Sequence, residues 1–305
     1  MQNLPILDLP GPDFLNVFGL VVIGVLGAAY ICIRFADRTD RRPPPPVPQN
    51  PDAMEVAFLQ GGVNQVIRTL IYDLAQRGLV ALAPKDHVIP TECQPQPGEL
   101  NAMETLLFEA AQAKPKAHVL FEDRSLRRRL LEQLAPIRAK LAAEALIKPV
   151  SVKIWRRRAQ IVGTLIIVGL AFAKIAVEWS KGPSNLAYLI FLAAASVAAL
   201  FALAYVMTRT HASRRGHAYL EAMRLAYGGR LQAAVAHIGS PGPEARAFHG
   251  AALFLIGLYG FAPLKGTTEA MFAETFSRGS QSQGSNCGSS CGGSCGDGGA
   301  SGGGD

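Results

Sequence analysis

The sequence predicts a mainly α-helical protein that crosses a membrane three times and carries a small helical domain on one side. Two observations predict the spans: three long apolar runs have no acidic residue inside them, and basic residues flank each run. The runs are Phe14–Phe35, Ile161–Val177 and Leu186–Met207. A hydrocarbon core about 30 Å thick needs roughly 20 apolar residues of helix, whose backbone groups are satisfied within the helix. We therefore expect transmembrane helices at 14–35, 161–177 and 186–207, with the lipid bilayer as a partner.

The ends of these runs carry two further signals. The second run is the shortest, and we expect Lys174 near its end to snorkel towards the headgroups. The chain's only two tryptophans, Trp155 and Trp179, bracket this run, as aromatic residues do at the headgroup level. A cleaved signal peptide is the alternative for the first run. The preceding segment, 1–13, lacks the positive charge that a signal peptide needs, so we expect a retained span.

Basic residues set the expected orientation, because loops rich in Lys and Arg stay in the cytoplasm. The basic clusters follow the first span, precede the second and follow the third; they are Arg34, Arg38, Arg41, Arg42, Lys153, Arg156, Arg157, Arg158, Arg209, Arg214 and Arg215. The loop 178–185 holds a single lysine. We expect a multi-pass protein of a bacterial inner membrane, with the N-terminus (1–13) outside. Residues 36–160 and 208–305, including the C-terminus, are then cytoplasmic.

Residues 36–50 form a proline-rich linker, and residues 51–150 have the pattern of one small helical domain. The run of prolines at 43–46 predicts an extended spacer. We expect a helix capped by Asn50 with Pro51 at its first position, a break at Gly61-Gly62, and a second helix ending at Gln76. A hairpin over 79–89 and helices near 101–113, 124–134 and 137–147 follow. A helix, a turn, a helix and a hairpin in this order resemble a winged-helix module in architecture.

The distribution of charge along the chain argues against a nucleic-acid-binding protein. The net charge of the chain is +7, but residues 51–150 contain twelve Lys or Arg and twelve Asp or Glu, so the excess lies beside the spans. Three consecutive arginines, Arg127–Arg129, spread around a helix axis, and the second predicted helix offers few basic or amide groups to a groove. We therefore expect the 51–150 domain to dock a protein partner, and we expect no nucleic acid.

Residues 208–276 form a second helical region. Short helices are expected at 213–227 and 230–238, and a longer one at 244–262 after a Pro/Gly-rich turn. The apolar stretch 247–264 has two interpretations: a fourth span, or a helix that packs on the cytoplasmic domain or lies at the interface. We favour the second, and the choice matters because a fourth span would place the C-terminus outside.

The tail, 277–305, is rich in Gly, Ser and Cys and lacks the apolar residues that folding requires, so we expect disorder. It contains Cys287, Cys291 and Cys295 at four-residue intervals. Three thiolates are suited to zinc or copper(I), although structural zinc sites use four ligands, and Cys93, a histidine or water would have to complete the set. Redox chemistry or covalent attachment at the thiols is an alternative, as is an unstructured tail without either role.

Several short motifs follow one another along the chain. They are Phe58-Leu59-Gln60-Gly61-Gly62 with the helix through Leu74, Arg77-Gly78-Leu79, the paired spans, Ala251–Gly257, and the Gly/Cys tail. In this order the chain resembles an uncharacterised family of bacterial membrane proteins with Gly/Cys-rich C-termini. The resemblance covers most of the chain and implies the architecture, but it implies no activity.

The remaining patterns point away from catalysis. The chain contains no HExxH, Walker A or GxGxxG motif, so we expect neither a catalytic residue nor a resident cofactor, although a noncanonical site stays open. Small residues at Gly24 and Ala28, Gly169 and Ala173, and along 194–202 permit close helix contact and homo-oligomerisation. The leading hypothesis is a membrane-anchored scaffold or interaction protein. The alternative is a metal-binding or thiol-redox tail tethered to the membrane.

Overall fold

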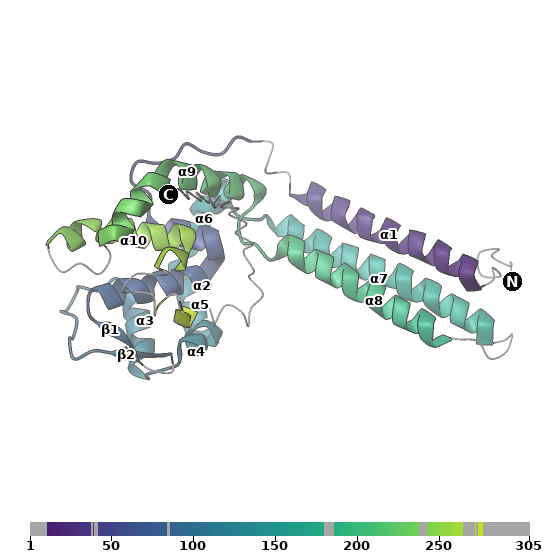
Figure 1. The fold of residues 1–305 in the computed structure, drawn as a ribbon, viewed down its shortest axis with the longest axis horizontal. Coiled ribbons are helices and arrows are strands. Elements are labelled where there is room, and N and C mark those ends of the chain that lie inside the picture. The colour runs from purple at the N-terminus through teal and green to yellow at the C-terminus, as the bar shows by residue number, and fades with distance from the viewer. Residues whose placement is uncertain are drawn as a thin grey trace, which may run out of the picture.

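The chain forms a bundle of three long helices and, at one end of it, a body of shorter helices with a β-hairpin (Figure 1). The computed structural model describes residues 11–37, 39, 42–83, 86–179, 186–237, 243–264, 272 and 274–276. The bundle consists of α1 (Gly11–Ala36), α7 (Val150–Trp179) and α8 (Leu186–Thr208). The body consists of α2 (Ala53–Gln76), β1 (Val80–Ala83), β2 (His87–Pro90), α3 (Ala102–Gln112), α4 (Ala117–Glu122), α5 (Arg124–Gln133), α6 (Ala135–Ala143), α9 (Arg214–His237), α10 (Pro243–Tyr259) and the 3-10 turn η2 (Ala262–Leu264).

The bundle confirms the predicted mainly helical fold with three helices long and apolar enough to cross a membrane. The candidate spans within them are Phe14–Ala36, Val150–Ala176 and Tyr188–Thr208. Where the three helices meet, the contact is tight. A β-carbon at Gly163 would lie 2.7 Å from Leu200 Cδ2 and 3.0 Å from Val25 Cγ1. Large apolar side chains on the outer faces of the helices are exposed, as lipid contact requires; they include Leu20, Phe172 and Phe191.

The structure locates Lys174 and the small residues of the three helices. Lys174 is only 4% exposed, and its Nζ atom lies 4.9 Å from the centre of the ring of Phe14, the residue at which the first candidate span begins. The small residues proposed for helix contact lie mostly outside the bundle: Gly24 and Gly169 are exposed and have open space where a β-carbon would be. The periodicity of small residues gave no information on which face the neighbouring helices cover.

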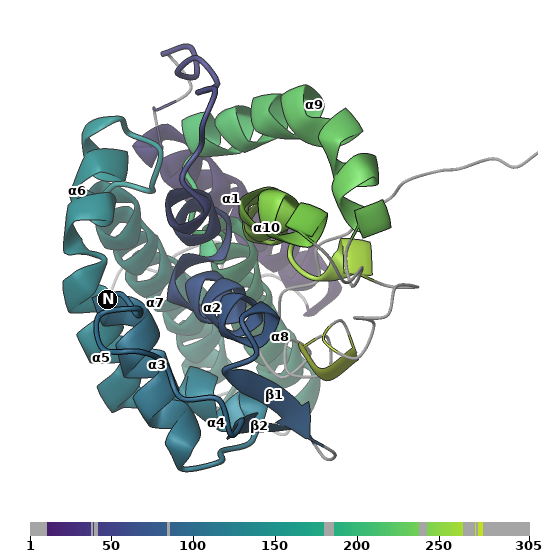
Figure 2. The same ribbon diagram turned by 90° about the vertical axis from the view of Figure 1, so that its left-hand side faces the viewer.

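The body is built around α2, which bends at paired glycines. Gly62 has φ +63° and ψ −151°, a conformation that essentially only glycine adopts, so the bend depends on this residue. The helix after the bend buries the predicted apolar stripe, including Val66, Ile67, Leu70 and Leu74. Figure 2 shows α2 and α10 side by side in the middle of the body. The interpretation of 247–264 as a helix packed on the body is therefore supported, because α10 buries Leu255, Ile256 and Leu258 there.

The hairpin and the end of α2 agree with the sequence analysis. Gly78 has φ +72° and ends α2 in the left-handed conformation. Strands β1 and β2 pair antiparallel, with Val80 opposite Pro90 and Ala83 opposite His87. Other boundaries differ. The N-cap of α2 is Asp52, whose carboxylate accepts a hydrogen bond from the Met54 amide, in place of Asn50. Helix α4 was not expected, and α9 is one helix where two were expected.

Residues 51–150 and 208–276 share a single hydrophobic core. Its buried residues include Leu70 and Leu126 from the first segment, and Met223, Leu258 and Phe276 from the second. The linker 36–50 is also attached to this core: the Tyr227 hydroxyl on α9 donates to the Pro48 carbonyl at 2.6 Å. The spacer predicted from its prolines is therefore held against α9, where Val47 packs on the core.

Candidate functional site

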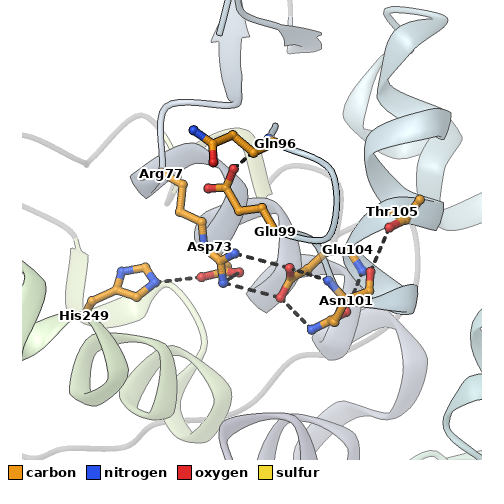
Figure 3. Close-up of polar contacts among 8 residues, drawn as sticks. All are labelled: Asp73, Arg77, Gln96, Glu99, Asn101, Glu104, Thr105 and His249. Atoms are coloured by element: carbon orange, nitrogen blue, oxygen red, sulfur yellow. Dashed lines mark hydrogen bonds and ion pairs between the residues drawn. The ribbon is translucent and has the colours of Figure 1, made fainter. Parts of the chain in front are cut away.

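A chain of polar and charged side chains connects α10, α2 and α3 (Figure 3). Asp73 on α2 is 1% exposed, and its Oδ1 atom lies 2.7 Å from Nε2 of His249 on α10. One helical turn further along α2, Arg77 Nη2 lies 2.9 Å from Asp73 Oδ2. Asp73 Oδ2 accepts no well-aligned hydrogen bond among the described residues, so this second contact is purely an ion pair. A buried carboxylate needs such compensation, because desolvation disfavours its charge.

Arg77 extends the chain of charges to α3. Its Nη1 atom lies 3.3 Å from Glu104 Oε2, and its Nη2 donates to Glu104 Oε1 at 3.4 Å. Glu104 is the third residue of α3, and it forms a capping box with Asn101: each side chain binds the other residue's backbone amide. The capping box holds the Glu104 carboxylate in the position where Arg77 contacts it. The arrangement therefore ties the start of α3 to the end of α2.

Further contacts hold α10 against α2. The Gln65 side chain donates to the Ile256 carbonyl at 2.7 Å within the core. Gly257 allows the two helices to approach closely, since a β-carbon there would lie 2.9 Å from the Ala53 carbonyl oxygen. Together with the His249–Asp73 pair, these contacts fasten α10 along its length. The charged cluster thus acts as a clamp between elements that are far apart in the sequence.

The second feature is the neck, which we define by the described residues of the three chain segments that join bundle and body: 37, 39 and 42–43; 144–149; and 207–216. The first and third segments meet where the Arg214 amide donates to Asp37 Oδ2 at 3.3 Å and Arg215 Nε donates to the Pro43 carbonyl at 2.9 Å. The Thr39 hydroxyl donates to the other oxygen of Asp37 at 2.6 Å. Asp37 is 7% exposed, so its charge is satisfied within the neck.

The second and third segments of the neck are joined even more closely. The Ser213 amide donates to the Leu146 carbonyl at 2.8 Å, and the Ser213 hydroxyl donates to the Ala145 carbonyl at 2.7 Å. The Lys148 ammonium donates to the Met207 carbonyl at 2.9 Å, at the end of α8. A β-carbon at Gly216 would overlap the Leu146 carbonyl oxygen, so the backbones approach as closely as glycine permits. The third segment of the neck is therefore hydrogen-bonded to each of the other two.

His211 lies in the neck and packs on the bend of α2. Its ring meets the Phe58 ring edge to face, with 4.8 Å between the centres, and a β-carbon at Gly62 would lie 3.7 Å from it. The Nε2 atom is buried without a hydrogen-bond partner among the described residues. Burial, followed by the nearby cations Lys153, Arg138 and Lys148, lowers the pKa of His211 to about 4. The imidazole is therefore neutral at neutral pH and behaves as an apolar ring.

The cysteines predicted to bind metal, Cys287, Cys291 and Cys295, lie outside the described residues, as do the rest of 277–305, the segment 1–10 and the loop 180–185. Cys93 is exposed in the loop after β2, and Cys32 lies in α1. Within the described ranges, no group of three His, Cys, Asp or Glu side chains is placed to hold a metal ion. The tail also contains two GxSxG strings, at 288–292 and 292–296, which arise from its Gly/Ser composition. A nucleophile elbow needs a strand-to-helix turn as well.

The segment that leads to the tail is anchored in an aromatic cluster. Phe276 stacks on Phe261 with 5.0 Å between ring centres, and Phe272 meets the Tyr72 ring at 5.7 Å. The Thr275 hydroxyl donates to Asp86 Oδ1 at 3.1 Å, between β1 and β2. The tail therefore begins at the hairpin of the body.

The clamp and the neck were not predicted from the sequence, because both join distant segments. A signal was present in the sequence: Asp73 lies three residues after Leu70, beside the apolar stripe, where an acid must be paired. His249 lies within the apolar stretch 247–264, where a polar side chain likewise needs a partner. Comparisons with protein-family models, with curated proteins and with solved structures each gave no match.

Proposed function

We propose that this protein is a membrane-anchored scaffold whose body docks a protein partner at the cytoplasmic face of a bacterial inner membrane. The neck carries this proposal. Hydrogen bonds such as Ser213 to Leu146 and Arg214 to Asp37 join the three connections between bundle and body, so the body has a defined position relative to the spans. A scaffold needs such a position, whereas a body on a flexible tether would present no defined face to the membrane.

The orientation rests on the basic residues at the neck end of the bundle. In the described part of the chain these include Arg34, Lys153, Arg157 and Arg209. Lysine and arginine remain on the cytoplasmic side during insertion, which places the body inside and the start of α1 outside. The resemblance to a bacterial membrane-protein family supports the same assignment.

Residues 51–150 are the proposed docking region, and the winged-helix-like order of α2 and the hairpin belongs to this proposal. The arginine run at 127–129 favours protein over nucleic acid, because all three of its side chains already have partners in the body. Arg127 Nη1 donates to Asn64 Oδ1 at 2.7 Å, and Arg129 lies 3.7 Å from Glu109. Val119 and Leu131 are exposed apolar side chains on α4 and α5 and provide positions from which a partner can be captured.

Site-specific photocrosslinking of the full chain in native membranes tests the docking proposal. A photoreactive residue replaces Val119 or Leu131, and the control carries it at Leu225, which is 82% exposed on α9, outside 51–150. We expect one recurring protein adduct from positions 119 and 131 and none from 225. Identical background adducts from all three positions would contradict a docking face in 51–150.

Homo-oligomerisation through the bundle is part of the proposal. Ala194, Ala198 and Ala202 follow one another on the exposed face of α8, where a second copy can approach closely. Replacing Ala198 by Phe should then reduce the size of the detergent-solubilised particle in light scattering. Ala193, which packs against the bundle core, does not belong to this face.

A second candidate function is soft-metal or thiol chemistry in the tail, with zinc or copper(I) at Cys287, Cys291 and Cys295. The Thr275–Asp86 contact supports it, because it places the start of the tail beside the hairpin that leads to exposed Cys93. A chain extends by at most about 3.5 Å per residue, so the tail thiols can reach Cys93. We expect the full chain to bind copper(I) or zinc, Cys93→Ser to weaken binding, and the triple serine variant of the tail to abolish it. Equal binding by the triple variant would exclude this function.

A further inference from the structure

The first turns of α7 differ in chemistry from the rest of the bundle. Helix α7 has 30 residues, and at 1.5 Å per residue it is about 45 Å long, whereas the hydrocarbon core is about 30 Å thick. Its neck end contains Lys153, Arg156, Arg157 and Arg158 next to Trp155. When the apolar part of α7 spans the core, these residues lie at the level of the lipid headgroups.

This end of α7 has an inner and an outer face. On the inner face, Val152 packs with Ile33 and Ala204, and Arg156 Nη1 donates to the Thr208 hydroxyl at 3.0 Å. On the outer face, Lys153, Ile154, Trp155, Arg157 and Arg158 are all exposed. Trp155 is 44% exposed and Ile154 is 48% exposed. The outer face therefore mixes cations with large apolar groups, a combination suited to the boundary between headgroups and acyl chains.

The cations of the outer face are available for a ligand. Lys153 and Arg157 are four residues apart on one side of the helix, and neither has a hydrogen-bond or ion-pair partner in the described part of the chain. The Arg158 guanidinium carbon lies over the Trp155 ring, 5.7 Å from its centre, and the side chain is exposed. The Asp37 carboxylate, in the neck, accepts hydrogen bonds from the Thr39 hydroxyl and the Arg214 backbone amide. It therefore does not neutralise the cations of the outer face.

A second observation lies on the inner side of the same turns. The Nε atom of Arg156 is buried and has no hydrogen-bond partner among the described residues. Lys148 is close by, since it donates to the Thr210 hydroxyl at 2.7 Å while Arg156 binds Thr208. Positively charged side chains therefore continue around the start of α7 towards the end of α8. Among them, the buried Arg156 Nε–H group has no acceptor in the described part of the chain.

We propose that the first turns of α7 bind the phosphate headgroup of anionic phospholipids from the surrounding bilayer. Lys153 and Arg157 hold the phosphate, Arg158 contributes a third positive charge, and Trp155 and Ile154 contact the glycerol and upper acyl chain. Charge complementarity identifies the occupant: this surface is cationic, partly apolar and level with a layer of lipid phosphates. The inference depends on the bundle spanning a membrane, but it does not depend on the scaffold function.

Tryptophan fluorescence gives a direct test, because the chain has only two tryptophans. In a Trp179→Phe background the emission reports Trp155 alone. The full chain is reconstituted in phosphatidylcholine nanodiscs in which phosphatidylglycerol brominated on its upper acyl chain is increased stepwise. Parallel discs contain brominated phosphatidylcholine. We expect quenching by the anionic lipid to saturate at a low mole fraction, and quenching by the neutral lipid to rise in proportion to its content.

Variants locate the site. Lys153→Gln with Arg157→Gln should raise the mole fraction of anionic lipid needed for half-maximal quenching about tenfold. Lys153→Arg with Arg157→Lys keeps the charges and should leave it unchanged, which controls for disturbed folding. Arg124→Gln with Arg128→Gln removes the same charge from exposed positions on α5 and should also have no effect. Equal quenching by both lipids, or an unchanged midpoint in the first variant, would overturn the proposal.

Discussion

His249 Nε2 lies 2.7 Å from Asp73 Oδ1 although the two residues are 176 positions apart. The pair joins α10, which follows the third candidate span, to α2, which precedes the second. The body is therefore built from segments on both sides of α7 and α8 in the sequence. Two short polar contacts, Asp73 with His249 and Gln65 with Ile256, add to the buried apolar side chains that hold α10 on α2.

Asp73→Asn should destabilise the body by about 2 kcal/mol, because it removes the buried carboxylate that contacts both Arg77 and His249. The ion pair between Arg77 and Glu104 remains in the variant. The unfolding of the detergent-solubilised chain in urea measures this change. Glu132→Gln breaks an exposed pair, with 3.7 Å between Arg128 Nε and Glu132 Oε1, and serves as the control. Such a pair contributes little, so the two variants should differ clearly, and equal midpoints would show that Asp73 is not a clamp.

Stability should fall as the pH is lowered from 6.5 towards 4, and His211 should account for about 3 kcal/mol of the loss. The unfolded chain protonates this imidazole near pH 6.5, but the folded chain does so only near its lowered pKa of about 4. Protons therefore favour unfolding within this window, and the contribution of His211 is complete above it.

Unfolding midpoints of the wild type and His211→Gln across pH 4–7 measure this contribution. The variant should retain a shallower pH dependence, because burial also lowers the pKa of His217, which acts in the same direction. Parallel curves for the two proteins would exclude His211 as the source.

Gly62→Ala should destabilise the chain by more than about 1 kcal/mol, since alanine is strained at φ +63° and ψ −151°. Gly228 gives a matched comparison. It lies within α9, its β-carbon position is open, and alanine there should stabilise the helix by about 0.5–1 kcal/mol. Thermal unfolding of the two variants should therefore shift in opposite directions. A shift in the same direction would mean that the bend of α2 is not glycine-dependent.

Gly163→Leu should weaken the bundle by about 1–3 kcal/mol, because the new side chain collides with Leu200 and Val25. Gly169→Leu adds the same side chain at a position with open space, and the bundle should tolerate it. The two variants are compared by the concentration of sodium dodecyl sulfate at which the helical circular-dichroism signal of the chain is lost. Similar loss in both variants would indicate that close packing at Gly163 is unimportant.

The sequence predicted the elements that depend on local chemistry. Span length follows from apolar runs, and the bend and end of α2 follow from Gly61-Gly62 and Gly78, because glycine takes backbone angles that other residues avoid. The hairpin also follows from short-range turn signals. Each of these features is determined by fewer than thirty consecutive residues.

Non-local contacts could not be predicted in the same way. The contact between Lys174 and Phe14 depends on how α1 packs against α7. Asp73 has the same helix propensity whether solvated or buried, and one of its partners, His249, comes from the distant helix α10. The tail thiols stay a prediction, since Cys287, Cys291 and Cys295 lie outside the described residues.

The close backbone contact at Gly216 has a mechanical consequence. A tilt or rotation of a single span cannot be absorbed at a loose joint, since the Leu146 carbonyl already touches the turn that follows α8. A change in bilayer thickness or lateral pressure that tilts the helices would instead rotate the whole body as one rigid unit about the neck.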